Sequence, residues 1–68
     1  MSGSTKASWP EVVGLPAEAA KQKILADRPD LRVVLVPFGS SVITDVNPKR
    51  VFVFLDQARN VARIPKIG

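Results

Sequence analysis

The sequence contains neither cysteine nor histidine. Without cysteine it can form no disulfide and no thiolate site, and without histidine it lacks the imidazole of most zinc sites and catalytic triads. A metal ion would have to be held by carboxylates alone, yet the six acidic residues stand singly, at spacings that suit neither a metal cage nor an acid/base pair. We therefore expect no metal, no cofactor and no enzymatic activity.

Long hydrophobic runs are missing as well. Apolar runs such as residues 33–36 are far shorter than the roughly 20 residues that a transmembrane helix needs. The residues after Met1 are polar and do not form the apolar region of a signal peptide. We expect a soluble chain with no membrane partner, made without an export signal, and the absence of cysteine suits the cytosol.

The residues that are present fit one small folded domain. Of the 68 residues, 46% are hydrophobic and 24% are charged, a balance typical of a chain that folds rather than of a disordered one. A chain of this length has room for one core. We expect residues 1–8, which are mostly small and polar, to form a flexible arm, and residues 9–68 to form the domain.

The net charge of +4 raises the question of nucleic-acid binding, because positive charge attracts phosphate. From Lys49 onward, Asp56 is the only acidic residue among several lysines and arginines. Single-strand binders, however, combine such charge with exposed aromatic side chains, and here two of the three phenylalanines fall in a predicted strand. With no recognisable motif, we expect no specific nucleic-acid partner.

Hydrophobic periodicity predicts one helix. Residues 16–27 carry an apolar stripe that includes Ala20 and Ile24, and a proline suits the first helical turn. The helix is expected to end at Arg28, because the residue before a proline is pushed out of the helical region. Trp9, the only tryptophan, is expected to anchor the core.

A β-branched run predicts a strand at residues 32–36, and valines alternating with phenylalanines predict a second at 50–55. Residues 60–64 are a candidate for a short third strand. The first has no polar alternation after its arginine, so we expect both of its faces to be covered or nearly so. The second alternates, with aliphatic residues on one face and two phenylalanines on the other. The third is limited by Pro65 and is expected to pair antiparallel to the second.

The connection between the first two predicted strands, residues 38–49, is unusually long. Most connections in compact domains have about four to six residues, and a longer one without its own structure is usually functional or disordered. Disorder fits poorly, because its middle is rich in β-branched residues between Gly39 and Pro48. We expect a wide exposed loop whose apolar side chains meet a partner. The alternative is a hairpin in which residues 41–46 pair with a neighbouring strand.

Several short motifs follow one another along the chain. They are Ser-Trp-Pro-Glu-Val-Val-Gly at residues 8–14, Ala-Lys at 20–21, Arg-Pro at 28–29, Val-Pro-Phe-Gly at 36–39, Arg-Val-Phe-Val-Phe at 50–54 and Val-Ala-Arg-Ile-Pro-Lys-Ile-Gly at 61–68. In order and spacing they resemble the potato inhibitor I family of serine protease inhibitors. The resemblance implies an α+β fold, with one helix packed on a small mixed β-sheet and residues 38–49 as a long exposed reactive-site loop.

The resemblance also implies a reactive bond. The spacing from Gly39 to Arg50 matches the family without insertion and places the scissile bond between Thr44 and Asp45. Thr44 would enter the specificity pocket of a subtilisin-, chymotrypsin- or elastase-like serine protease, and the inhibitor is expected to be a monomer. The residues expected to contact the protease on either side of the bond are Ser41, Val42, Ile43, Val46 and Asn47.

Family members without disulfides stiffen this loop with polar braces. Asp45 and Arg50 match that pattern, and we expect a charge-assisted hydrogen bond between them. Ile43, Phe52 and Asn47 stand where the family often has a threonine and two arginines. Because braces are missing and a threonine fills a large apolar pocket poorly, the resemblance implies a weak or temporary inhibitor. The alternative is a non-inhibitory or engineered scaffold of the same fold.

Overall fold

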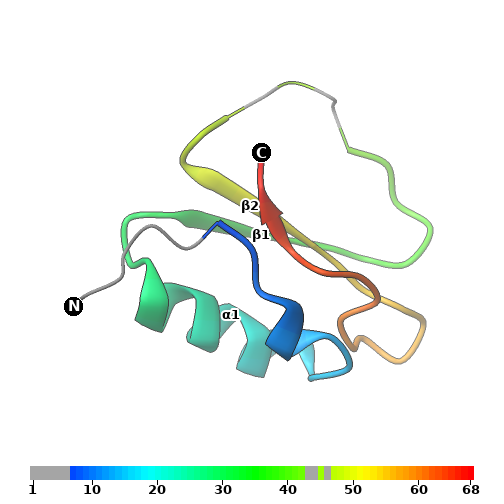
Figure 1. Ribbon diagram of the computed structural model, residues 1–68. Helices are drawn as coiled ribbons and strands as arrows, with labels where there is room; N and C mark the ends of the chain where they lie inside the picture. The colour runs from blue at the N-terminus through cyan, green and yellow to red at the C-terminus, as the bar shows by residue number, and fades with distance from the viewer. Residues whose placement is uncertain (1–6, 43–44, 46) are drawn as a thin grey trace.

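The computed structural model describes residues 7–42, 45 and 47–68. One helix, α1 (Ala17–Asp27), packs against one face of a three-stranded sheet (Figure 1). The strands are β1 (Arg32–Val36), β2 (Arg50–Phe54) and β3 (Lys66–Ile67), and the 3-10 turn η1 (Pro10–Val12) precedes the helix. β2 is the central strand, parallel to β1 and antiparallel to β3. This confirms the expected α+β fold with a small mixed sheet.

The helix begins one residue later than predicted. Pro16 is its N-cap residue, with an extended backbone (φ −59°, ψ 150°), and the first helical residue is Ala17. The residues that face the core, Ala17, Ala20 and Ile24, belong to the predicted stripe. At the other end, Arg28 leaves the helical region (φ −137°, ψ 80°) because the proline after it excludes that conformation.

Trp9 is completely buried and anchors the core, as predicted. Its indole Nε1 donates a hydrogen bond of 3.0 Å to Oδ2 of Asp27, so the opening segment is tied to the end of α1. The buried cluster joins the opening segment, the helix and the inner face of β2. Its members are Trp9, Val12, Ala17, Ala20, Ile24, Leu31, Val51, Val53, Leu55 and Val61.

The two predicted long strands differ in how well they are covered. β2 alternates as expected, since Val51 and Val53 are buried under the helix while Phe52 and Phe54 are half-buried on the opposite face. β1 was expected to be covered on nearly both faces, yet Val36 alone is buried in it and its three preceding residues are half-buried. The reason is position, because β1 lies at the edge of the sheet, with β2 as its neighbour on one side.

The prediction of a third strand at residues 60–64 is wrong. β3 lies farther on, at Lys66–Ile67, and Val61 forms only an isolated bridge with Leu55, which itself lies just beyond the end of β2. The main-chain N–H of Val61 donates to the carbonyl of Leu15, and its carbonyl accepts from Gly14. The N–H of Ala62 still donates to the carbonyl of Phe54 at 2.8 Å, so this segment pairs with the end of β2 at one bridge without forming a strand.

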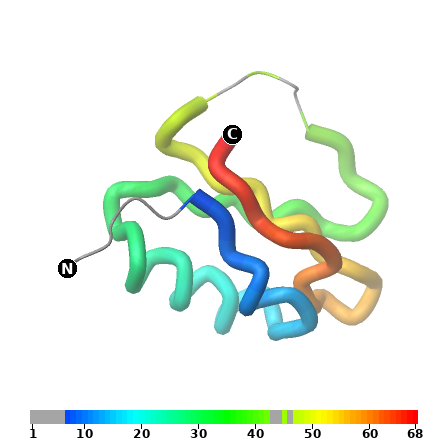
Figure 2. The backbone as a smooth tube through the Cα atoms, in the orientation of Figure 1, coloured from blue at the N-terminus to red at the C-terminus, as the bar shows by residue number. Residues whose placement is uncertain are grey.

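Two segments from the opposite ends of the described chain run side by side (Figure 2). Ser8 bridges Lys66 in antiparallel fashion, and the carbonyl of Ala7 accepts a hydrogen bond of 3.1 Å from the N–H of Ile67. Of the predicted N-terminal arm, residues 1–6 lie outside the described residues. The contacts of Ala7 and Ser8 supply hydrogen-bond partners to the outer edge of β3.

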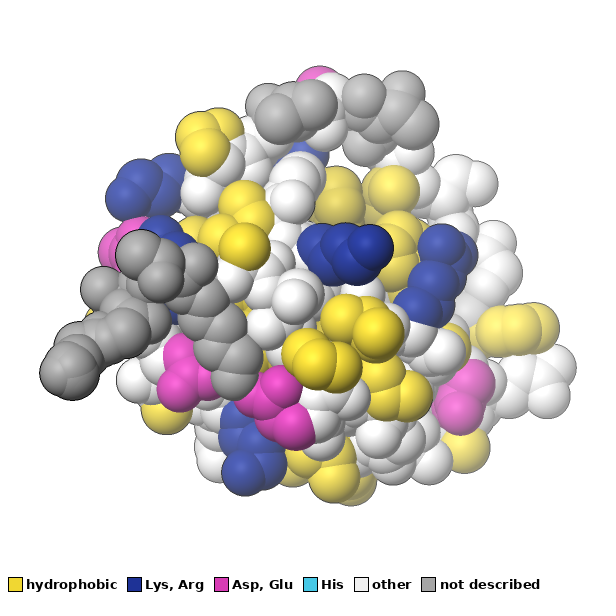
Figure 3. All heavy atoms as spheres, viewed as in Figure 1, with side chains coloured by type: hydrophobic (Ala, Val, Ile, Leu, Met, Phe, Trp, Pro, Cys, Tyr) yellow, Lys and Arg dark blue, Asp and Glu magenta, His cyan; other side chains and the backbone are white. Residues whose placement is uncertain are grey.

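The surface carries both hydrophobic and charged side chains, as the composition predicts. In Figure 3, Lys and Arg side chains are scattered among hydrophobic and acidic ones on the visible face. Among the helices of the described residues, none combines the length and the apolar character needed to cross a bilayer.

Candidate functional site

The described parts of the long connection between β1 and β2 extend beyond the sheet, on the side away from α1 (Figure 1). It starts with a tight turn, in which the carbonyl of Pro37 accepts a hydrogen bond of 3.1 Å from the N–H of Ser40. Gly39 has φ +84° at the third position, the left-handed conformation that such a turn requires and that glycine tolerates. The turn leaves the Phe38 side chain 62% exposed.

Past this turn, the described loop residues face solvent and lie outside any strand. Ser41, Asp45 and Asn47 are exposed and Val42 is half-buried. The hairpin alternative, which concerned residues 41–46, is not supported at Ser41, Val42 and Asp45, the three positions of that range that the structure describes. The predicted pocket residue, Thr44, lies outside the described residues, as do Ile43 and Val46, two of the residues expected to contact the protease.

Asp45 is held by Arg50, as predicted. One terminal nitrogen of the Arg50 guanidinium donates to the Asp45 main-chain carbonyl at 2.8 Å and lies 3.0 Å from the carboxylate Oδ1. This hydrogen bond lowers the pKa of the Asp45 carboxyl below its ordinary value. The two partners differ in exposure, because the Asp45 side chain is 60% exposed and that of Arg50 only 13%. Solvent therefore screens the charge pair, and the main-chain hydrogen bond adds a geometric restraint.

Arg50 is fixed on its other sides as well. Its Nε donates to the main-chain oxygen of Gly68 at 2.9 Å, and the N–H of Gly68 donates to the carbonyl of Arg50 at 2.8 Å. The guanidinium carbon lies 4.4 Å from the centre of the Phe52 ring, which is a cation–π contact. Phe52, which stands where the resemblance implies an arginine, thus contacts the guanidinium of Arg50 with its ring.

A second cation–π contact lies on the same face of β2. Phe52 and Phe54 have ring centres 6.2 Å apart, and the guanidinium of Arg63 lies 4.2 Å from the centre of the Phe54 ring. A groove of about 640 Å³ runs along this face of the sheet. It is lined by Val13, Phe52, Phe54, Ala62, Arg63, Ile64, Lys66, Ile67 and Gly68.

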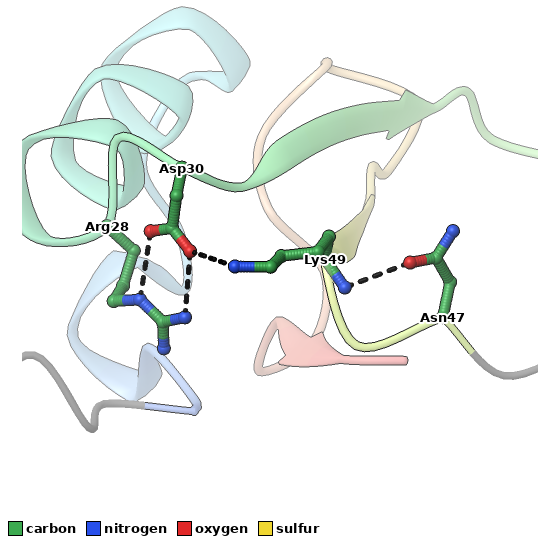
Figure 4. Close-up of polar contacts among 4 residues, drawn as sticks. All are labelled: Arg28, Asp30, Asn47 and Lys49. Atoms are coloured by element: carbon green, nitrogen blue, oxygen red, sulfur yellow. Dashed lines mark hydrogen bonds and ion pairs between the residues drawn. The ribbon is translucent and has the colours of Figure 1, made fainter.

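At the other end of the loop, Asn47 belongs to a chain of polar contacts with Lys49, Asp30 and Arg28, three residues to which sequence reasoning gave no role in the loop (Figure 4). Asn47 Oδ1 accepts a hydrogen bond of 2.9 Å from the N–H of Lys49, so Asn47 bonds locally. The Lys49 ammonium lies 3.0 Å from Asp30 Oδ2, and Asp30 is in turn bound by Arg28. Arg28 and Asp30 follow α1, whereas Asn47 and Lys49 precede β2. The parallel pairing of β1 with β2 brings the two pairs together.

The chain is thus a small α+β domain, without cysteine in its sequence, that presents a long loop between two parallel strands. The model of the Potato inhibitor I family matches residues 1–68, and the chain belongs to this family. Membership agrees with the expectation that the chain is not an enzyme.

Named relatives of this chain are protease inhibitors. The chain is 42% identical over 67 residues to subtilisin-chymotrypsin inhibitor CI-1C from Hordeum vulgare, covering 98% of this chain and 87% of that protein. It is 45% identical over 64 residues to subtilisin inhibitor 1 from Phaseolus angularis, covering 94% of this chain and 70% of that protein. Among solved structures, the bitter gourd trypsin inhibitor aligns with a TM-score of 0.88 at 40% identity, covering 93% of each chain.

Proposed function

We propose that this chain inhibits serine proteases by presenting its long loop to the protease active site as a substrate that is cut and released poorly. Family membership and the names of the relatives support inhibition over the alternative of a non-inhibitory scaffold. The observation that carries the mechanism is the attachment of Asp45 to Arg50 through both its main chain and its carboxylate.

The proposed reactive bond lies between Thr44 and Asp45. In this proposal Thr44 enters the specificity pocket, Ser41, Val42 and Ile43 lie along the enzyme on the acyl side, and Val46 and Asn47 lie on the leaving side. When the protease cuts this bond, the new amine belongs to Asp45. Because Arg50 holds Asp45 in place, that amine stays near the acyl-enzyme, and religation competes with hydrolysis.

The inhibition is proposed to be weak or temporary. Thr44 is small for the pockets of chymotrypsin-like and subtilisin-like enzymes, whereas an elastase-like pocket accepts a small side chain better. Arg50 provides a single charged brace to Asp45, and Phe52 acts through Arg50. A loop with fewer restraints loses more freedom on binding, which lowers affinity. The inhibitor is proposed to act as a monomer, which light scattering of the free protein would test.

The test is inhibition of subtilisin, chymotrypsin and elastase, with the intact mass of the inhibitor followed over time. We expect inhibition of at least one enzyme, with slow cleavage that adds one water across the bond after Thr44. A Thr44→Leu variant should tighten binding to chymotrypsin, because a larger apolar side chain fills its pocket. If neither the original chain nor the Thr44→Leu variant inhibits any of the three proteases, the non-inhibitory scaffold is supported instead. Rapid cleavage at another bond would contradict the proposed reactive site.

A further inference from the structure

The leaving side of the loop is tied to the connection between α1 and β1 (Figure 4). We propose that Asp30 and Lys49 are positioning residues that hold Asn47, and with it the leaving side of the reactive bond, in the shape a protease binds. This inference rests on the proposed inhibitory function. The name loop-exit clamp is used here for Arg28, Asp30, Asn47 and Lys49.

The clamp first fixes Asn47 locally. Its side-chain Oδ1 accepts from the N–H of Lys49 at 2.9 Å, and its main-chain carbonyl accepts from the N–H of Arg50 at 3.3 Å. Between these residues Pro48 has a restricted φ angle, which removes much of the freedom of this turn. The orientation of Asn47 therefore follows from the positions of Lys49 and Arg50, where β2 begins.

Lys49 is then fixed against the rigid part of the domain. Its carbonyl accepts a hydrogen bond of 2.8 Å from the N–H of Arg32, and its ammonium donates to Asp30 Oδ2 at 3.0 Å. Lys49 and Asp30 lie close together because β1 and β2 are parallel. With Arg32 opposite Arg50, the residues that precede the two strands lie at the same end of the sheet.

Asp30 is already in position to receive Lys49. Arg28 grips both carboxylate oxygens, with Nε 3.1 Å from Oδ1 and a terminal nitrogen 3.0 Å from Oδ2. The Arg28 side chain is only 17% exposed, so this planar fork is held in place by the surrounding structure. Hydrogen bonds from Arg28 and then Lys49 hold the pKa of Asp30 well below its ordinary range. Less side-chain freedom is lost when Lys49 binds a carboxylate that is already ordered.

The clamp complements the brace on Asp45. Arg50 fixes Asp45 toward the sheet, and the clamp fixes Asn47 toward the end of the helix. Two described residues of the leaving side are thus restrained from two directions. Such restraint favours both binding and the return of the new amine after cleavage.

A double-mutant cycle tests the clamp. Lys49→Met and Asp30→Asn should each raise the inhibition constant about 1.5- to 5-fold, the range expected for an exposed ion pair. The double variant should be no worse than the more affected single variant, and Lys49→Arg should keep the original value. Lys23→Met is the matched control, because Lys23 is an exposed helix lysine and its loss changes the net charge equally. Additive effects, or effects equal to the control, would overturn the proposal.

A second measurement needs no protease. Amide hydrogen exchange at Lys49 and Arg50 should speed up in Lys49→Met and in Asp30→Asn, with an unchanged urea midpoint, because both N–H groups bond to Asn47. Unchanged exchange would contradict the clamp even if the chain inhibits proteases. If the unaltered chain inhibits no protease, the proposed function fails, while the exchange rates still decide whether the clamp orders the loop.

Discussion

At the scale of single residues, Arg50 connects three parts of the molecule through one guanidinium group. It binds Asp45 in the loop, the main-chain oxygen of Gly68 and the ring of Phe52. The sequence predicted the bond to Asp45 through the family resemblance. It could not predict the stacking on Phe52, because a residue two positions along a strand becomes a cation–π partner only when the side chains bend toward each other. The Asp30–Lys49 pair was missed because the two residues lie 19 positions apart.

The contact between Arg50 and Phe52 determines what an arginine introduced at position 52 would do. Phe52→Arg alone should not tighten inhibition, because it removes the ring under Arg50 and places a like charge there. Combined with Ile43→Thr, which restores a polar group on the loop, we expect the inhibition constant to fall about tenfold relative to Phe52→Arg alone. Ile43→Thr in the original chain is the control. Equal inhibition constants for Phe52→Arg and the double variant would show that the missing braces are not what limits affinity.

At the scale of elements, periodicity predicted α1, β1 and β2 well because each carries a local signal. The helix has an apolar stripe and a proline at either side, and β2 has strict alternation. β3 was misplaced because Lys66–Ile67 is only two residues long, too short to carry a pattern, whereas residues 60–64 read as a strand. The hydrogen bonds of Val61 with Gly14 and Leu15 join residues that are far apart in the sequence, so no local pattern predicts them.

The helix packs on one face of the sheet, and Arg50, which contacts Asp45, lies with Phe52 on the opposite face of β2. Ile24→Ala should therefore lower the free energy of unfolding by about 2 to 5 kcal/mol, because Ile24 is completely buried. Urea unfolding measures the loss. Leu25→Ala is the matched control and should cost less, because Leu25 is half-buried. Inhibition by the folded Ile24→Ala protein should stay unchanged, and a large rise in its inhibition constant would show that the loop depends on the helix.

At the scale of the whole molecule, a domain without disulfides must stiffen its loop through the fold itself. The described residues do this at Asp45, through Arg50 and the end of the described chain, and at Asn47, through Lys49 and the end of α1. Both attachments lie on the leaving side of the proposed reactive bond. The central claim is therefore that the cut chain keeps its new amine in position to be rejoined.

The equilibrium between intact and cut inhibitor tests this claim most directly. Intact protein and protein cut after Thr44 are each incubated with a catalytic amount of subtilisin, and the two forms are counted by intact mass. We predict that both mixtures converge on the same ratio with a measurable intact fraction, and that Arg50→Met shifts this ratio toward the cut form. Complete cleavage from both starting points, with no intact chain regained, would contradict the account.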